Sequence, residues 1–114
     1  MVIATDTRFL FSLYGADCHT SVAKAWSSSN SSPIHSHVLA RFELLNSFRF
    51  AEYRKFIPPD TALNYSVRFE SDASKRLHRE TYVNFAKIID ATHLLTFDAN
   101  QKELAESEGL IVPF

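Results

Sequence analysis

Two aspartates follow short apolar runs that are typical of buried strands. Asp6 comes directly after residues 2–5, and Asp98 comes directly after residues 93–97. Because ligands of open parallel sheets bind outside the carboxyl ends of the strands, we expect both carboxylates at one such edge. Like charges crowded together are costly unless a proton or cation neutralises them. A hard divalent cation, Mg²⁺ or Mn²⁺, would do so through oxygen ligands, and it can activate water for displacement at phosphorus.

A structural role is the alternative for the same two residues. Aspartate is a favoured residue at the first position of a helix, where its carboxylate accepts hydrogen bonds from backbone amides. The sequence after Asp98 is typical of the start of a helix. The two aspartates are therefore candidates for catalysis, for helix capping, or for both.

The elements that position these residues alternate between strands and helices. Apolar runs predict strands at residues 2–5, 34–36, 93–97 and 110–112. Helical spacing predicts helices at residues 9–14, 19–26, 38–57, 61–90 (with a break near 71–74) and 101–108. The serine-rich stretch 27–33 predicts a loop. This order predicts an α/β fold, with a small parallel sheet flanked by helices, in a single domain spanning residues 1–114.

The expected helix at residues 38–57 has an apolar stripe with an acidic residue beside it. Between residues 38 and 57 the apolar side chains recur at three- and four-residue steps, and Glu43 lies beside them. The expected core stripe consists of Val38, Leu39, Phe42, Leu45, Phe48 and Tyr53. Pro58-Pro59 ends this helix because proline lacks the amide donor.

Composition narrows the class of protein. The chain has 114 residues, of which 46% are hydrophobic and 22% charged, as in ordinary globular proteins. The single cysteine excludes an internal disulfide and suits a reducing compartment. No apolar run approaches the roughly 20 residues of a membrane helix, and no signal peptide is visible. We expect a cytoplasmic protein that does not enter a membrane.

Charge is unevenly distributed along the chain. The net charge is −1, yet residues 41–79 hold eight basic and five acidic residues. A basic middle beside acidic ends is compatible with a phosphate-facing surface next to a carboxylate site, and equally with solvated helix faces.

Several aromatic residues exceed what a small core needs. Phe48, Phe50, Tyr53 and Phe56 cover more than one face of the expected helix, which indicates an interface with a partner or a second copy. Stacking of RNA bases on Phe50 and Phe56 is the alternative.

Three segments, in order, resemble the PIN-domain nucleases. The segment 95–110 contains Thr96-Phe97-Asp98, a short polar step and a Leu-Ala helix that ends in Gly-Leu, as at the end of that family. Asp6-Thr7 followed by an apolar helix resembles its first strand and catalytic aspartate. Residues 36–47 resemble the segment that carries its helical glutamate, Glu43 here. Among PIN domains, the chain is most similar to VapC-type toxins of prokaryotic toxin–antitoxin systems.

The resemblance implies a Mg²⁺-dependent (or Mn²⁺-dependent) ribonuclease that cleaves RNA phosphodiesters with about four acidic residues. Asp6, Glu43 and Asp98 correspond to three of these acids and to the implied metal ligands. The implied partners are RNA and an antitoxin protein, and we also expect a homo-oligomer.

The fourth acid departs from the family pattern. Its position falls on Arg79, and Glu80 lies one residue further on, where it would substitute only if the expected helix rotated or a residue were deleted. Arg8 stands where the family commonly has a small polar residue. An arginine in the pocket would either bind a phosphate oxygen or offset the charge that attracts the metal. The sequence thus leaves two hypotheses: a toxin-type endoribonuclease, and a catalytically impaired PIN-like domain that binds RNA or a protein partner.

Overall fold

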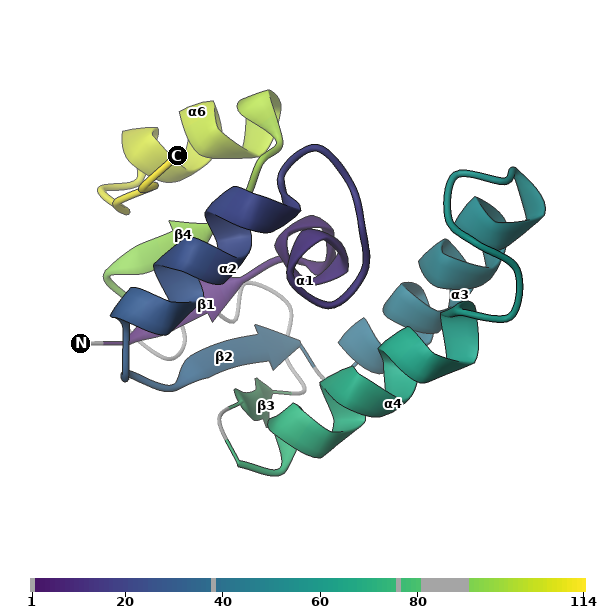
Figure 1. Cartoon of the computed structure of the whole chain (residues 1–114). Coiled ribbons are helices and arrows are strands. Elements are labelled where there is room, and N and C mark those ends of the chain that lie inside the picture. The colour runs from purple at the N-terminus through teal and green to yellow at the C-terminus, as the bar shows by residue number, and fades with distance from the viewer. Residues whose placement is uncertain (1, 38, 76, 81–90) are drawn as a thin grey trace.

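The computed structural model describes residues 2–37, 39–75, 77–80 and 91–114, the side chains of 77–80 excepted. Within them, strands β1 (Ile3–Thr5), β2 (Ile34–His37), β3 (Leu77–Glu80) and β4 (His93–Leu95) form one sheet in the order β3-β2-β1-β4. All three strand pairings are parallel. The helices are α1 (Thr7–Tyr14), α2 (Thr20–Ser29), α3 (Ala40–Tyr53), α4 (Ala62–Ala73) and α6 (Ala99–Ser107). The predicted α/β fold with a small parallel sheet is confirmed (Figure 1).

The sheet is centred on β1, whose residues are all buried. Helices α1 and α2 pack against each other beside this strand, and α3 and α4 pack side by side as a helical hairpin next to α1 (Figure 1). The core joins the sheet to these helices through large apolar side chains. Its largest members are Phe9, Phe48, Phe69, Ile3, Leu10, Ile34, Leu44 and Leu95.

Helices α1 and α3 approach each other closely at Gly15. This residue ends α1, and its amide donates to the Phe11 carbonyl at 2.8 Å. A Cβ atom at Gly15 would lie 2.7 Å from that carbonyl oxygen and 2.8 Å from the Phe48 ring. Only glycine fits such an approach.

The buried face of α3 differs from the expected stripe. Its buried residues are Ala40, Leu44, Phe48 and Ala51. Of the predicted stripe residues that the structure describes, only Phe48 belongs to this face. Leu39, Phe42 and Tyr53 are 49%, 56% and 81% exposed, and Val38 lies outside the described residues. Alanines at the first and last buried positions present little side chain to the neighbouring elements. Periodicity of large residues therefore indicated the wrong face, and it left several aromatic rings in solvent.

The predicted helix 61–90 is wrong at residues 77–80, which form a strand. The expected break near residues 71–74 is present, since α4 ends at Ala73 with Ser74 as its cap. The chain then forms β3, which pairs with β2 along its whole length. Pairing with the open edge of β2 outweighs local helix propensity here, because strand formation depends strongly on context. The last part of that predicted helix, residues 81–90, lies outside the described residues.

Two smaller predictions also change. Residues 27–29, expected in a loop, continue α2, and the Ser29 hydroxyl donates to the Ala25 carbonyl at 2.9 Å. The expected strand 110–112 is reduced to one bridge, between Ile111 and His93. Pro113 follows and cannot donate an amide hydrogen to extend the ladder. Among the described residues, no helix is both long and apolar enough to cross a membrane.

Candidate active site

Asp6 is fixed at the carboxyl end of β1 by its own hydrogen bonds. One carboxylate oxygen accepts the Phe9 amide at 2.8 Å and so caps α1. The other accepts the Thr96 hydroxyl at 2.6 Å. The Asp6 amide donates to the Leu95 carbonyl at 3.2 Å, which ties the residue to β4. Asp6 therefore has one defined orientation, facing the end of the neighbouring strand.

Asp98 lies beside it at the end of the segment that follows β4. Its Oδ1 accepts the amides of Asn100 and Gln101 at 2.9 and 3.0 Å and caps α6. Its own amide donates to the Thr96 hydroxyl oxygen at 3.0 Å. The Thr96 hydroxyl thus connects the two aspartates. The prediction that residues 2–5 and 93–97 form parallel neighbouring strands with both aspartates at one edge is confirmed, and so is the capping role of each.

Arg8 projects from the first turn of α1 towards this pair. Its Nη1 lies 3.5 Å from Oδ2 of Asp98, and the Arg8 side chain is 72% exposed. An exposed ion pair contributes only about 0–1 kcal/mol to stability. The main effect of Arg8 is therefore to place a positive charge next to the carboxylates. Of the two arginines singled out in the sequence, Arg8 is the one whose described side chain adjoins the carboxylates.

Glu43 approaches from α3 and contacts the first turn of α1. The Thr7 hydroxyl donates to Glu43 Oε2 at 2.8 Å. Glu43 and Asp6 line one cavity of about 370 Å³, together with Thr7, Arg8 and His37. The structure thus brings the three acids of the predicted site to one region, with Glu43 separated from the aspartate pair by Thr7.

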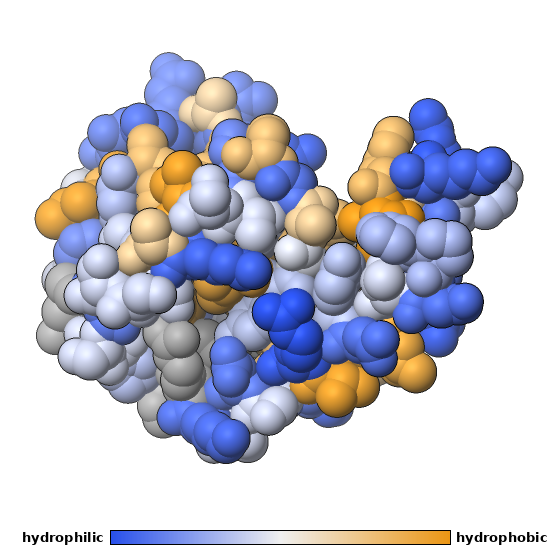
Figure 2. All heavy atoms as spheres, in the orientation of Figure 1, coloured by the Kyte–Doolittle hydropathy of each residue, from blue (hydrophilic) through white to orange (hydrophobic). Residues whose placement is uncertain are grey.

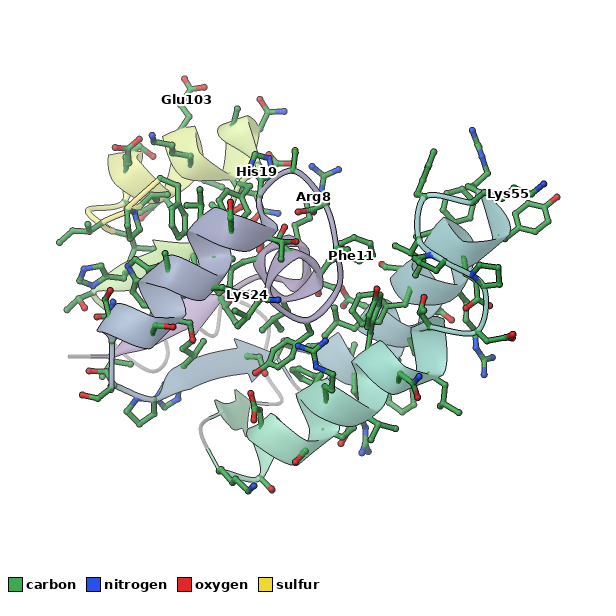
Figure 3. All side chains as sticks on the ribbon, viewed as in Figure 1. Arg8, Phe11, His19, Lys24, Lys55 and Glu103 are labelled. Atoms are coloured by element: carbon green, nitrogen blue, oxygen red, sulfur yellow. The ribbon has the colours of Figure 1, made fainter. Side chains whose placement is uncertain are left out.

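A second cavity of about 460 Å³ adjoins the first, since both are lined by Thr7, Arg8 and Glu43. It continues between α1 and α3, where Phe11 points from α1 towards α3 (Figure 3). Its other lining residues are Phe11, Ser12, Asp17, His19, Ser47 and Phe97. The cavity that contains Asp6 and Glu43 is therefore continuous with a groove between α1 and α3.

Burial raises the pKa of the Asp6 carboxyl above its ordinary value of 3.8. Hydrogen bonds from Thr96 and Phe9 and the charge of Arg8 oppose this increase, whereas the charge of Asp98 adds to it. The raised pKa means that an additional positive charge next to Asp6 is favourable.

The carboxylate oxygens of Asp6, Asp98 and Glu43 are of the kind that Mg²⁺ or Mn²⁺ prefers, although they do not form a complete metal site. Among the described residues, no three His, Cys, Asp or Glu side chains are grouped as a ready metal site. Magnesium, however, is commonly held by one or two carboxylates together with water and substrate phosphates. Asp6 and Asp98 supply such a carboxylate pair, and Glu43 lies close enough to line the same cavity as Asp6.

Arg79 and Glu80, the candidates at the fourth acidic position, lie on β3 rather than on a helix. Register pairs Arg79 with Ser36 and Glu80 with His37. Because β2 separates β3 from β1, this places their backbone about 10 Å from β1. Their side chains lie outside the described part of the chain, so their roles stay predictions.

Sequence reasoning missed two hydroxyls, and it did not assign His37 to this site. Thr96 and Thr7 bind Asp6 and Glu43, and His37 lines the cavity that contains both acids. The threonines were visible only as neighbours of aspartates. For His37 the available signal was its position at the end of an expected strand, at the same sheet edge as Asp6.

A scan of the chain against protein-family models finds no match, and a search of curated proteins finds none either. The resemblance to PIN domains therefore rests on the residues of the three segments named above.

Proposed function

We propose that this chain is a divalent-metal-dependent endoribonuclease of the toxin type. The observation that supports it most is the Thr96-linked pair of Asp6 and Asp98 at the carboxyl edge of β1 and β4. Asp6 and Glu43 line one cavity, and this cavity adjoins the groove between α1 and α3. This combination suits hydrolysis of a chain-like phosphodiester at the mouth of the groove.

The contacts of each residue suggest its role in the proposed reaction. Asp6 and Asp98 would hold Mg²⁺ or Mn²⁺, which when bound supplies an activated water and a positive charge for the phosphate. Thr96 orients the carboxylate of Asp6 by its hydrogen bond and fixes the backbone of Asp98. Arg8, largely exposed beside Asp98, is positioned to bind a phosphate oxygen of the RNA. A toxin-type activity further suggests an antitoxin protein as partner.

A second candidate is a catalytically impaired PIN-like domain that binds RNA or a protein partner. The Arg8–Asp98 ion pair favours it, because a guanidinium there supplies part of the positive charge that a metal would supply. The two candidates differ in whether phosphodiester bonds are broken, and they share the same groove.

Cleavage of single-stranded RNA distinguishes them. The unmodified protein is incubated with labelled RNA in Mg²⁺, in Mn²⁺ and in chelator, beside the Asp6→Asn and Asp98→Asn variants. The endoribonuclease proposal expects cleavage that needs the cation and is lost in both variants. Cleavage that persists in chelator or in Asp6→Asn would come from a contaminant and oppose the proposal. Binding without cleavage under all conditions would favour the impaired domain.

A further inference from the structure

The outer end of the α3–α4 hairpin carries two exposed aromatic rings around one arginine. Phe50 and Phe56 are 58% and 69% exposed. The Arg54 guanidinium carbon lies 5.8 Å from the centre of the Phe50 ring and 5.5 Å from that of Phe56. Lys55 lies beside them at the end of the hairpin (Figure 3). We call these four residues the hairpin tip. We infer that the hairpin tip binds single-stranded RNA.

The backbone of the hairpin tip is built by the end of α3. The Phe56 amide donates to the Ala51 carbonyl at 2.8 Å, and the Lys55 amide donates to the Glu52 carbonyl at 3.0 Å. This is the Schellman pattern, in which the residue with positive φ is usually glycine. Here it is Lys55, with φ of 60°. A lysine in this conformation costs stability relative to glycine.

The positive charge of the hairpin tip is not balanced by the nearest acid of α3. Glu52 is directed to the start of α4, where its Oε2 accepts the amides of Thr61 and Ala62, both at 3.0 Å. Within the described part of the chain, neither Arg54 nor Lys55 forms an ion pair with a carboxylate. Two cations beside exposed rings are complementary to the phosphates and bases of an unpaired strand.

The hairpin tip is aligned with the candidate active site along one side of α3. Glu43, Ser47, Phe50 and Arg54 follow at intervals of four, three and four residues, which places them on a single helix stripe. Glu43 and Ser47 line the groove described above. Eleven residues of helix span about 16 Å, so the stripe leads from the acids to the hairpin tip. The choice of RNA as ligand rests on the proposed ribonuclease function.

A second copy of the chain fits this surface less well. In Figure 2 the outer end of the hairpin shows hydrophobic spheres interleaved with strongly hydrophilic ones, rather than a continuous apolar face. Two such tips meeting face to face would bring Arg54 and Lys55 of both copies together, and like charges across an interface are costly. Arginine and aromatic rings in alternation are typical of sequence-tolerant stacking on bases.

The test measures binding without cleavage. Anisotropy of a short labelled single-stranded oligoribonucleotide is recorded in chelator, with the unmodified protein and with the Phe50→Ala/Phe56→Ala variant. Base stacking on aromatic rings predicts an affinity loss of about tenfold or more in that variant. The matched control is Leu63→Ala/Val67→Ala, which removes two exposed side chains of α4 and should bind like the unmodified protein.

Lys55→Gly provides a second readout that misfolding cannot imitate. It should bind RNA more weakly, and the slope of log affinity against log salt should decrease by about 0.7, as expected for one lost phosphate contact. The same variant should unfold at higher denaturant because glycine suits the positive φ.

Equal affinity of the aromatic variant and the unmodified protein would overturn the inference, and so would absence of RNA binding by the unmodified protein. A dimer that dissociates in the aromatic variant, with RNA binding unchanged, would identify the hairpin tip as a protein interface instead. Because chelator prevents metal-dependent cleavage, a protein that binds through the hairpin tip but never cleaves would contradict only the proposed function. A protein that cleaves while the aromatic variant binds normally would contradict only this inference.

Discussion

The Thr96 hydroxyl donates a 2.6 Å hydrogen bond to the carboxylate of Asp6, a residue 90 positions earlier in the chain. The same oxygen accepts the Asp98 amide at 3.0 Å. Thr96 is 1% exposed, so neither contact is exchanged easily for water. One buried hydroxyl therefore sets the position of both aspartates of the candidate active site.

Replacing Thr96 tests this arrangement. Thr96→Val preserves shape but removes the hydroxyl that binds Oδ2 of Asp6 and the Asp98 amide. The expected loss in free energy of unfolding is about 1–3 kcal/mol, measured by urea denaturation. Thr96→Ser keeps the hydroxyl and should lose less. A Thr96→Val protein as stable as the unmodified one would show that the hydroxyl contributes no net stability.

Asp6 variants separate the cap from the charge. Asp6→Asn retains an oxygen that can accept the Phe9 amide, and it removes a carboxylate whose pKa is raised by burial. It should therefore be at least as stable as the unmodified protein at neutral pH. Asp6→Ala loses the cap and should be less stable by about 1 kcal/mol. Thermal unfolding of the three proteins in the same buffer measures both effects.

The pH dependence of stability follows from the same group. The folded-state pKa of Asp6 lies above its unfolded value of 3.8, so the folded protein holds more protons between those two pH values. Its contribution to stability is therefore fully present below pH 3.8 and decreases as the pH rises through the folded-state pKa. The difference in stability between Asp6→Asn and the unmodified protein should accordingly grow with pH across that window. A difference that shrinks with pH would contradict the raised pKa.

Arg8→Ala should strengthen divalent-cation binding and weaken RNA binding. Removing the guanidinium 3.5 Å from Asp98 leaves more negative charge for a cation. Because the pair is exposed, the gain should not exceed about fivefold, which corresponds to about 1 kcal/mol. Calorimetric titration with Mn²⁺ and anisotropy with labelled RNA measure the two changes. Arg79→Asp is the companion variant, for which the family pattern predicts tighter cation binding. Unchanged Mn²⁺ affinity in both would exclude arginine as the charge that opposes the metal.

Gly15→Ala should destabilise the protein by about 1–3 kcal/mol, because overpacking forces neighbouring atoms to move. The added Cβ would meet the Phe11 carbonyl, which is backbone, and the buried Phe48 ring. Gly109→Ala is the control. It meets no atom within 4 Å but has φ of 84°, so conformational strain alone should cost about 1 kcal/mol. Equal losses in the two variants would indicate that the α1–α3 contact relaxes without cost.

What the sequence could predict depended on local signals. Asp6 and Asp98 were located because each follows an apolar run, and parallel strands bring such ends together. The strand at residues 77–80 could not be found in this way, because it forms by pairing with β2, whose residues lie about 40 positions earlier. The buried face of α3 was also missed, because Ala40 and Ala51 define it and small residues give a weak hydrophobic signal. The exposure of Phe42 and Tyr53, which the predicted stripe placed in the core, follows from the same error.

The position of β1 has a consequence for the order of folding. It pairs with β4, so Ile3 meets His93 only after a long stretch of intervening chain has been arranged. Closing so long a loop is entropically costly, whereas the α3–α4 hairpin needs only local contacts. We therefore expect the hairpin and the β1–β2 unit to form first and β4 to join last. During synthesis, Asp6 would remain without Asp98 until β4 and the residues after it had left the ribosome, so the carboxylate pair would form late in folding.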